Sequence, residues 1–355
     1  MNDQSNKLFN AISEIGNDPK ARDALLDILK SWEERNKKKD VELREEVTGH
    51  VIDALYENVD EVTKKLANGM VMTLPYRSKI ARDFAMAETN PDHVWEPQTT
   101  TLLLKLAEMA NHMLVGGAYA GDQAVLAAKE LGKNNGYVHC FEPNIEQSAA
   151  LLNNANNNAV KNISVSNDGL WNVKGWLKLQ GSDSHAYPVE AKENEAGAFP
   201  TDTIDNYCDN HSVDKLDIIM LDIEGGEFKA LQGGEKRLSQ DEERAPDIVM
   251  EIHSSYTDWS NGLDGTDVLS YLQGLGYRTF AIRDYQSNVA MNGAPIELVP
   301  TNDIYIEGPH HGFNILASKK KEIVKLLNAK LVAGVSPKLL KHRDPALHQP
   351  KHNEG

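Results

Sequence analysis

Two carboxylates follow a largely apolar segment that the sequence predicts to be a strand. This segment covers residues 216–221. Asp222 follows it directly, and Glu224 comes two positions later. In an extended segment, side chains two positions apart lie on the same face. Carboxylates in such a place can take a proton from a reacting hydroxyl, bind a divalent cation or anchor an ammonium group. We therefore predict that Asp222 and Glu224 are catalytic residues.

Two histidines extend this set. His253 directly follows a predicted strand at 247–252, and His311 lies in a turn before a predicted strand at 313–317. An imidazole titrates near neutral pH and can act as a base or as a metal ligand. We predict catalytic roles for both histidines, and a possible divalent metal site formed by His253 with the two carboxylates. The two cysteines do not form a cluster, which argues against zinc.

A glycine-rich turn comes earlier in the chain. Residues 113–122 read Met-Leu-Val-Gly-Gly-Ala-Tyr-Ala-Gly-Asp, followed by a predicted helix at 123–131 and a strand at 137–141 that ends at Glu142. Strand, glycine turn, helix, strand and acid, in this order, are typical of a nucleotide-binding α/β unit. Glycines let a ligand approach the backbone closely, and Glu142 is placed to bind both hydroxyls of a ribose. We therefore predict a ligand that carries an adenosine.

The spacing within the turn separates two such ligands. Dinucleotides favour Gly-x-Gly-x-x-Gly, with a pyrophosphate at the helix N-terminus, whereas this turn has Gly-Ala-x-x-Gly and an acid at the start of the helix. A pyrophosphate would meet like charge there, so the pattern favours S-adenosylmethionine (SAM), which has no phosphate. A nicotinamide cofactor and a turn without any ligand are the alternatives. Asp168 is expected at the adenine amino group, and the predicted cofactor-binding residues are Gly116, Gly117, Ala118, Gly121, Asp122, Glu142, Asp168 and Asp222.

Helices and strands alternate from residue 99 onward. Strands that alternate with helices indicate a mostly parallel sheet covered on both faces. The polar side chains at the strand ends should then surround one crevice, because ligands bind beyond the carboxyl ends of such strands. Strands are predicted at 113–115, 137–141, 162–166, 216–221, 247–252, 278–282 and 313–317, and helices at 99–109, 123–131, 145–158, 227–238 and 268–275.

Several of these segments, in this order, resemble the FkbM family of SAM-dependent methyltransferases. The most specific are Glu-Pro-Asn at 142–144 and Leu-Asp-Ile-Glu-Gly at 221–225, and the resemblance covers roughly residues 95–320. It implies the α/β class I methyltransferase fold, a Rossmann-like, doubly wound and mostly parallel seven-stranded sheet. It also implies methyl transfer to a hydroxyl group. The matching segments are 115–121, 141–144, 151–154, 203–205, 220–227, 246–251 and 274–277.

One position departs from the family pattern. The family usually has an acid two residues before the Gly-Ala pair, where it helps to hold the amino-acid end of the cofactor, and this chain has Val115. Asp122 or Asp222 could bind the cofactor ammonium instead. The predicted function is SAM-dependent O-methylation of a sugar-like or natural-product small molecule. The alternatives are N-methylation on the same fold and an adenosyl-binding protein without catalysis.

Patterning divides the chain into three parts. Residues 1–92 are predicted to be mostly helical, with helical spacing that continues through 41–66 and a strand at 69–74. We expect this region to cover the site or to mediate a homodimer. Residues 93–325 form the predicted methyltransferase domain, and 326–355 a polar, loose C-terminal tail.

The net charge bears on partners and location. Lys and Arg number 37 against 53 Asp and Glu, so the formal net charge is −16, which repels nucleic acid and anionic membranes. The first residues lack the apolar core of a signal peptide, and no apolar run approaches the roughly 18 residues that span a bilayer. We expect a cytoplasmic enzyme that acts on a small molecule, without nucleic-acid or membrane partners.

Overall fold

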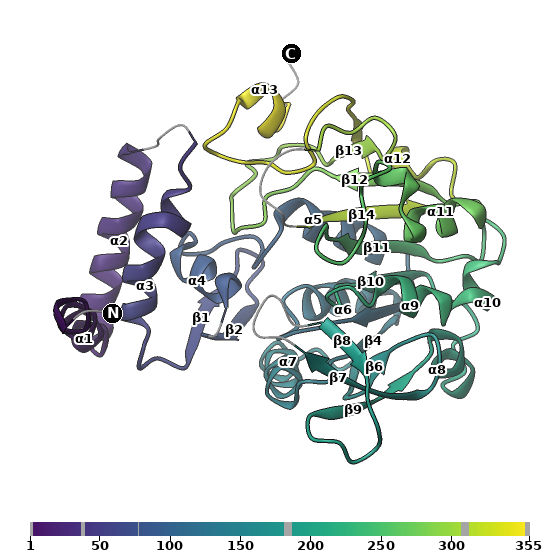
Figure 1. Ribbon diagram of the computed structural model, residues 1–355, viewed down its shortest axis with the longest axis horizontal. Helices are drawn as coiled ribbons and strands as arrows, with labels where there is room; N and C mark the ends of the chain where they lie inside the picture. Colours follow the sequence, from purple (N-terminus) through teal and green to yellow (C-terminus); the bar gives the residue numbers. More distant parts are fainter. Residues whose placement is uncertain (1–2, 37–39, 77, 181–186, 307–311, 352–355) are drawn as a thin grey trace.

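The protein is built around one large β-sheet (Figure 1). The computed structural model describes residues 3–36, 40–76, 78–180, 187–306 and 312–351. Within these residues the sheet has nine strands, in the order β15-β13-β12-β14-β11-β10-β3-β4-β5. In that order their bounds are Lys330–Leu331, Glu297–Pro300, Arg278–Ile282, Phe313–Ser318, Asp247–Ile252, Ile218–Leu221, His112–Gly116, Tyr137–Phe141 and Ile163–Ser166.

Seven of these strands have the doubly wound order that the resemblance implies. Numbered along the chain from β3, they lie in the order 3-2-1-4-5-7-6, and the seventh, β14, runs antiparallel to both of its neighbours. The predicted fold class is therefore confirmed. The predicted count of seven strands is too low, because β13 and β15 extend the sheet beyond β12. They have only four and two residues, too few to give an alternating pattern.

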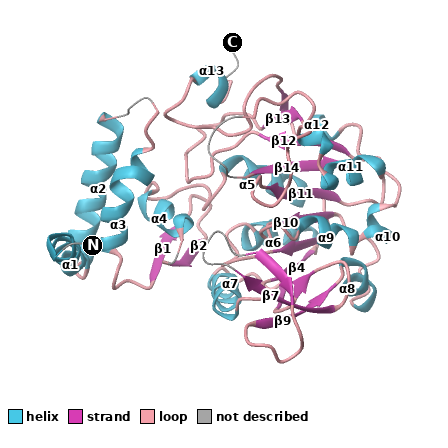
Figure 2. Cartoon of the chain, viewed as in Figure 1, coloured by secondary structure: helices cyan, strands magenta, loops and turns pink. Residues whose placement is uncertain are grey.

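Helices cover both faces of the sheet (Figure 2). Successive side chains of a strand point to opposite faces, and in β3 Met113 and Val115 join one buried apolar cluster while Leu114 joins the other. The first cluster includes α5 (Pro97–Ala107), α6 (Ala124–Leu131) and α7 (Ile145–Asn157), and the second α8 (Ile204–Asn210), α9 (Glu227–Gln232) and α11 (Asp267–Gly274). Shorter helices are η2 (Gly132–Asn134), α10 (Glu235–Leu238), η4 (Leu263–Gly265) and α12 (Ile323–Leu326).

The single helix predicted at 227–238 is wrong. The chain forms α9 and α10 instead, with a break at Gly233 and Gly234. A Cβ atom at Gly233 would lie only 2.2 Å from the carbonyl oxygen of Trp171. The close approach of these two backbone segments requires glycine at position 233, and glycine is a poor helix former.

A second, four-stranded sheet lies between β5 and α8 in the chain and was not predicted. Its order is β6-β9-β7-β8, with bounds Gly169–Leu170, Ala198–Asp202, Gly175–Gln180 and Tyr187–Glu190. Figure 1 shows it beneath the large sheet. Most of its side chains are half-buried or exposed, so this segment lacks the strong apolar runs by which the core strands could be predicted.

The described residues up to Met86 form helices and one hairpin. The helices are α1 (Asp3–Gly16), α2 (Pro19–Arg35), the π-helical η1 (Arg44–Thr48), α3 (Gly49–Leu55) and α4 (Lys79–Met86). The hairpin joins β1 (Glu61–Lys65) to β2 (Val71–Pro75). The helical spacing predicted through 41–66 is therefore wrong at its end, where Gly69 with φ +88° allows the chain to turn back.

Asparagines of α7 fasten this hairpin to the large sheet domain. The carboxamide of Asn154 accepts from the amide of Thr73 at 2.8 Å and donates to its carbonyl oxygen at 2.8 Å. Asn158 makes the same pair of bonds with Val71, both at 2.7 Å. These side chains satisfy the edge of β2 as another strand would, which gives the asparagine-rich end of α7 a structural role.

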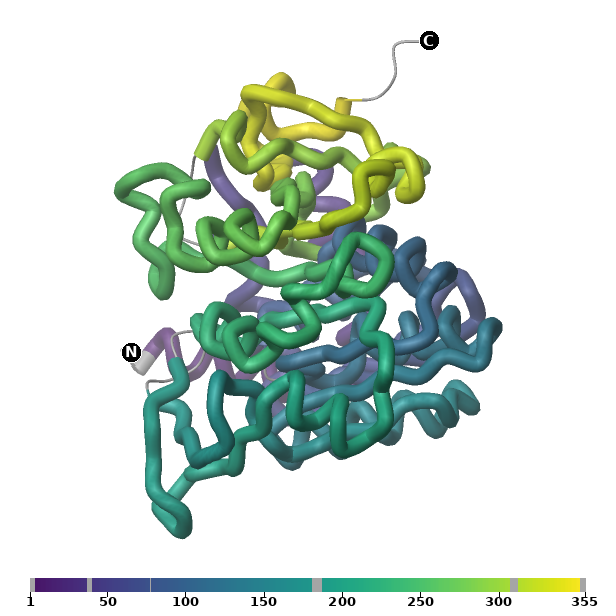
Figure 3. The backbone as a smooth tube through the Cα atoms, turned by 90° about the vertical axis from the view of Figure 1, so that its right-hand side faces the viewer, coloured from purple at the N-terminus to yellow at the C-terminus, as the bar shows by residue number. Residues whose placement is uncertain are grey.

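The C-terminal segment is held against the sheet, in contrast to the loose tail expected from its sequence. Arg283 and Glu297, both fully buried, form an ion pair at 2.6 Å. Arg283 also donates to the carbonyl oxygens of Ser336 at 2.9 Å and of Leu347 at 2.6 Å. Leu347 belongs to α13 (Pro345–His348). Figure 3 shows this segment, in yellow, at the same end of the molecule as the green residues after β12.

Among the residues that the structure describes, no helix combines the length and the apolar character needed to cross a membrane. The three-part division at 92/93 and 325/326, the homodimer and the cytoplasmic location stay predictions.

Candidate active site

A cavity of about 330 Å³ lies at the carboxyl ends of β3, β4 and β10. This is the edge of the sheet where the sequence predicts a ligand. Its walls come from the turn after β3, residues 141–144, residues 169–171 and the turn after β10. The four-stranded sheet adds an apolar side formed by Leu177, Leu179, Pro188 and Phe199.

The glycine turn is fixed by contacts with both neighbouring strands. The amide of Gly117 donates to the carbonyl oxygen of Phe141 at 3.0 Å, and a Cβ atom at Gly117 would lie 1.8 Å from the carbonyl oxygen of Asp222. Its φ is +75°. Only glycine satisfies both conditions. Tyr119, two residues later, places its hydroxyl 3.0 Å from that of Ser78 at the start of α4.

Glu142 is buried at the cavity wall with its carboxylate held in one orientation. One oxygen accepts from the amide of Tyr119 and the other from the amide of Asn144, both at 2.9 Å. Each oxygen keeps a further lone pair. Burial raises the pKa of Glu142. The carboxylate is therefore preorganised to accept from two adjacent hydroxyl groups.

The turn after β10 brings Asp222 and Glu224 to the same cavity. The side chain of Asp222 is exposed to the cavity, and its amide donates to the carbonyl oxygen of Gly116 at 3.0 Å. Burial raises the pKa of Asp222 to about 6. Burial and the charge of Asp222 together raise the pKa of Glu224 to about 7. Buried Glu227 holds the turn by accepting from the amide of Ile223 at 2.9 Å.

Further carboxylates surround Asp222. Burial and the charge of Asp222 raise the pKa of Asp122 to about 7. Burial raises the pKa of Glu251 and of Glu96 well above its usual range, and Asp222 contributes to both shifts. Keeping several buried carboxylates close together costs free energy unless a positive charge joins them. The site is therefore electrostatically suited to a cationic ligand.

Val115 does not take part in this site. Its side chain is buried in an apolar cluster of the core. Glu96, which precedes α5, is another buried acid that the charge of Asp222 affects, and it accepts from Asn314 at 2.8 Å. The sequence patterns did not indicate Glu96 and Glu251, which interact with Asp222 through their charges but do not line the cavity. A proline at the first position of a helix marks the helix start. The Glu96-Pro97 pair was therefore the sequence feature that could have placed Glu96 at the N-terminus of a helix.

The structure brings some of the predicted site residues together and leaves others aside. Gly116, Gly117, Glu142, Asp222 and Glu224 line the cavity. Ala118, Gly121 and Asp122 are buried behind the turn, and half-buried Asp168 lies beside Gly169, which does line the cavity.

The structure gives less information on His253 and His311, the two histidines predicted to be catalytic. His253 follows β11, accepts from the amide of Ser255 at 3.0 Å and places its ring 5.3 Å from that of Tyr256; it does not line the cavity. His311 lies outside the described residues. Within the described part of the chain, no three His, Cys, Asp or Glu side chains are grouped so that they could hold a metal ion. The predicted metal site at Asp222, Glu224 and His253 therefore has no support.

Comparison with known proteins identifies the central part of the chain. The model of the methyltransferase FkbM domain matches residues 116–279, which span the glycine turn, Glu142 and the turn after β10. The chain contains an FkbM methyltransferase domain. This confirms the predicted family and the predicted enzyme class, a SAM-dependent methyltransferase. No curated protein matches the sequence.

Several solved structures are similar to parts of the chain. The methyltransferase FkbM from Methylobacillus flagellatus KT is 15% identical, with 58% of this chain and 43% of that chain covered and a TM-score of 0.37. An O-methyltransferase from Bacillus cereus, solved in complex with SAH, is 12% identical, with coverage of 62% and 80% and a TM-score of 0.33. A SAM-dependent methyltransferase from Agrobacterium tumefaciens is 10% identical, with coverage of 74% and 71% and a TM-score of 0.39.

The carboxylates of the FkbM domain should make the ligand-free protein more stable as the pH falls from 8 to 6.5. Burial raises the pKa of Asp122 to about 7 and that of Glu227 to about 8, against about 4 in an unfolded chain. In this window the unfolded carboxylates stay ionised while the folded ones take up protons, so the folded state gains stability. We expect the free energy of unfolding to rise by about 1–2 kcal/mol, measured by urea denaturation at each pH.

Glu227→Gln should flatten this profile, whereas Glu146→Gln, at an exposed position in the first turn of α7, should leave it unchanged. An opposing effect grows as the pH approaches 6.5 and falls below it, because burial lowers the pKa of His139 to about 4 and protons then bind the unfolded imidazole preferentially. A stability that falls between pH 8 and 6.5 would contradict the assignment of buried, protonating carboxylates.

Proposed function

We propose that this protein transfers the methyl group of SAM to a hydroxyl group of a sugar-like or natural-product small molecule. The observation that carries the proposal is the cavity in which the glycine turn, Glu142 and Asp222 meet beside an excess of buried carboxylates. SAM carries a sulfonium and an ammonium group, and when bound it supplies an electrophilic methyl group. Its charge complements that of the site, and the FkbM domain supports the same assignment.

The residues present fit such a cofactor. Gly116 and Gly117 leave the backbone of the turn open to close approach. The carboxylate of Glu142 is fixed where it can accept from both ribose hydroxyls. Asp122, buried behind the glycine turn, adds negative charge on the side of the ammonium group. Asp168 stays a prediction as the partner of the adenine amino group.

A carboxylate base favours oxygen as the acceptor atom. A hydroxyl group must lose its proton as the new bond forms, and a positioned base typically contributes about 10²–10⁴-fold to the rate. Asp222 and Glu224 both line the cavity, with pKa values raised to about 6 and about 7. Carboxyl groups with pKa values in this range are ionised at mildly basic pH and can still accept a proton. We assign the base to Asp222, because it lines the cavity directly beside Gly116 and Gly117 of the glycine turn.

Isothermal titration with S-adenosylhomocysteine (SAH) and SAM tests the proposal. We expect both to bind with dissociation constants between about 1 µM and 1 mM, the usual range for enzyme substrates. NAD, titrated as a control, should bind more weakly because a pyrophosphate would meet the carboxylates. Binding of NAD without binding of SAH would contradict the proposal. Binding of SAM without transfer to any hydroxyl or amine in a broad acceptor panel would instead favour a non-catalytic adenosyl-binding protein.

A further inference from the structure

Tyr119 lies in the glycine turn with a backbone conformation that a tyrosine rarely adopts. Its φ is +46°, in the left-handed region where the Cβ atom of any residue other than glycine is crowded. Its side chain lines the cavity of about 330 Å³. A residue keeps such a conformation only where the surrounding structure holds it. Contacts from outside the turn must therefore fix Tyr119.

The conformation at Tyr119 orients the carboxylate of Glu142. The amide of Tyr119 donates to one of the carboxylate oxygens at 2.9 Å. The direction of an N–H group follows from the backbone torsion angles next to it, so a relaxation of Tyr119 to negative φ would redirect this donor. Of its two bonds from amides, Glu142 would then keep only the one from Asn144. The orientation of the predicted ribose-binding carboxylate thus depends on the backbone at Tyr119.

Two contacts from outside the turn hold it in place. The hydroxyl of Tyr119 lies 3.0 Å from that of Ser78, the N-cap residue of α4. The carboxamide of Asn154, which is fully buried, donates to the carbonyl oxygens of Ala120 at 2.9 Å and Thr73 at 2.8 Å. Both Ser78 and Thr73 belong to the N-terminal region, the segment from α1 to α4. The glycine turn is therefore connected to this region at two points.

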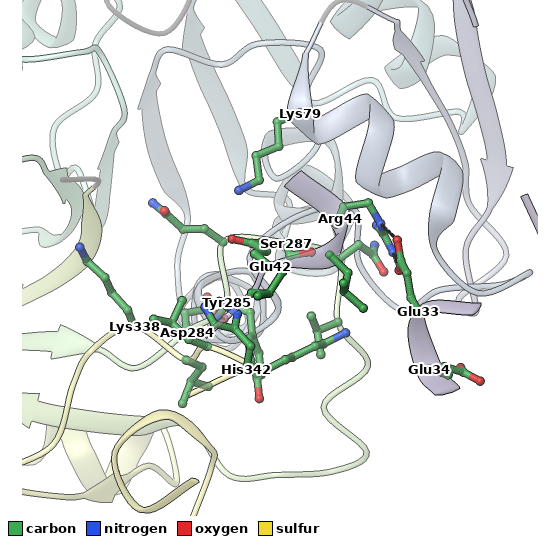
Figure 4. A pocket seen from close by; sticks show the side chains of 18 residues that line it. Glu33, Glu34, Glu42, Arg44, Lys79, Asp284, Tyr285, Ser287, Lys338 and His342 are labelled. Carbon is green, nitrogen blue, oxygen red and sulfur yellow. Dashed lines mark hydrogen bonds and ion pairs between the residues drawn. The ribbon is translucent and has the colours of Figure 1, made fainter. Parts of the chain in front are cut away.

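The N-terminal region is also fixed to the segment after β12. Asp83 of α4 pairs with Arg44 at 3.2 Å and accepts from the hydroxyl of Ser287. Arg44 also pairs with Glu33 of α2 at 2.6 Å. Figure 4 shows Arg44 beside Glu33, at a second cavity of about 190 Å³ that the N-terminal region and the segment after β12 line together. These bonds hold α4 in place, and with it the N-cap residue Ser78.

We propose that Tyr119 is a positioning residue for the cofactor, and that its bond to Ser78 keeps Glu142 directed at the ribose hydroxyls of SAM. The bond from Asn154 to the turn supports the same arrangement. The proposal rests on the function proposed above. It gives the N-terminal region, which lies outside the matched FkbM domain, a part in cofactor binding. Ile80 of α4 lines the same cavity as the glycine turn, in agreement with that role.

The test compares SAH with its 2′-deoxyribose analogue, each titrated into the full-length protein. Since the analogue lacks a hydroxyl that Glu142 accepts from, we expect the unmodified protein to bind SAH at least about tenfold more tightly, as one hydrogen bond to a charged group would give. Tyr119→Phe keeps the ring but loses the hydroxyl. This variant should lose most of the preference, because its binding of SAH weakens about five- to tenfold while that of the analogue changes less.

Ser78→Ala should act as Tyr119→Phe does. The double variant should lose no more of the preference than either single variant, since both hydroxyl groups belong to one hydrogen bond. A general loss of stability would weaken the binding of SAH and of the analogue alike and would leave their ratio unchanged. The ratio therefore separates a positioning role from a merely structural one.

Tyr76→Phe and Thr266→Ala are the matched controls. The hydroxyl of Tyr76 donates to Asp53 at 2.7 Å within the N-terminal region. Thr266 caps α11 at 3.4 Å, the distance at which Ser78 caps α4. Neither side chain lines the cavity, so both variants should keep the preference for SAH.

Asn154→Ala and Asn158→Ala form a second matched pair. Each side chain makes two bonds to β2, but Asn158 makes its further bond within α7, to the carbonyl oxygen of Asn154, instead of to the glycine turn. Only Asn154→Ala should therefore reduce the preference.

Three results would overturn the proposal: a preference for SAH that is unchanged in both Tyr119→Phe and Ser78→Ala, an equal loss of preference in Tyr76→Phe, or equal binding of SAH and the analogue by the unmodified protein. Failure of the function proposed above looks different, because the unmodified protein would then bind neither SAH nor the analogue.

Discussion

Replacing Gly117 with alanine should weaken the binding of SAH at least about 100-fold. The new Cβ atom would lie 1.8 Å from the carbonyl oxygen of Asp222, and the backbone at this position has a φ of +75°. Either the turn after β3 or the turn after β10 must therefore move, and both line the cavity. A displacement of about 1 Å in a catalytic site can cost about 10²-fold in rate, and we expect a comparable loss of affinity when a turn that contacts the cofactor is displaced. Isothermal titration of the variant with SAH measures the effect.

Gly276→Ala separates the steric clash from backbone strain. Gly276 has a φ of +90°, but a Cβ atom there would meet no heavy atom within 4 Å. This variant should lose about 1–2 kcal/mol of stability from the left-handed conformation alone and should keep the affinity for SAH. If Gly117→Ala folds and binds SAH as the unmodified protein does, the cavity beside the glycine turn does not hold the cofactor.

Asp222→Asn should reduce turnover by about 10²–10⁴-fold, the usual contribution of a general base. The carboxamide keeps the shape of the side chain but cannot accept the hydroxyl proton. In the unmodified enzyme, turnover should also fall below about pH 6, because burial raises the pKa of Asp222 to about 6 and protonation removes the base. The readout is tritium transfer from methyl-labelled SAM to small molecules in a protein-free extract, followed across pH.

Asp258→Asn provides the control for this variant. Asp258 is an exposed acid in the loop after β11, so its replacement should leave turnover and its pH dependence unchanged. SAH should still bind the Asp222→Asn variant within about tenfold of the unmodified affinity, since Glu142 and the glycine turn are intact. Full turnover in Asp222→Asn would exclude Asp222 as the base, and a selective loss in Glu224→Gln would transfer that role to Glu224.

Local patterns determined the central fold and the adenosyl side of the site. Short apolar runs predicted the seven strands that span from β3 to β14, because a strand buried on both faces has little room for polar residues. The glycine turn and Glu142 could be found for a similar reason. Each lies directly at a strand end, so sequence adjacency fixes its place at the carboxyl edge of the sheet.

Longer-range features could not be predicted in this way. The two strands beyond β12, which are β13 and β15, and the four-stranded sheet have weak patterns and form where the larger sheet offers them partners. The C-terminal segment is polar in sequence, yet its backbone carbonyls satisfy Arg283, a charge that the fold buries. Nothing in residues 336–347 themselves indicates that contact.

The sequence by itself determined a doubly wound methyltransferase sheet and the positions of Gly117, Glu142 and Asp222, because these depend on which residue follows which strand. Only the tertiary structure decided that Glu96 and Glu251 join Asp222, and that Ser78 and Asn154 contact the glycine turn. Those groups come from distant parts of the chain. The charges of the acids affect one another only because folding brings them together and removes the water between them.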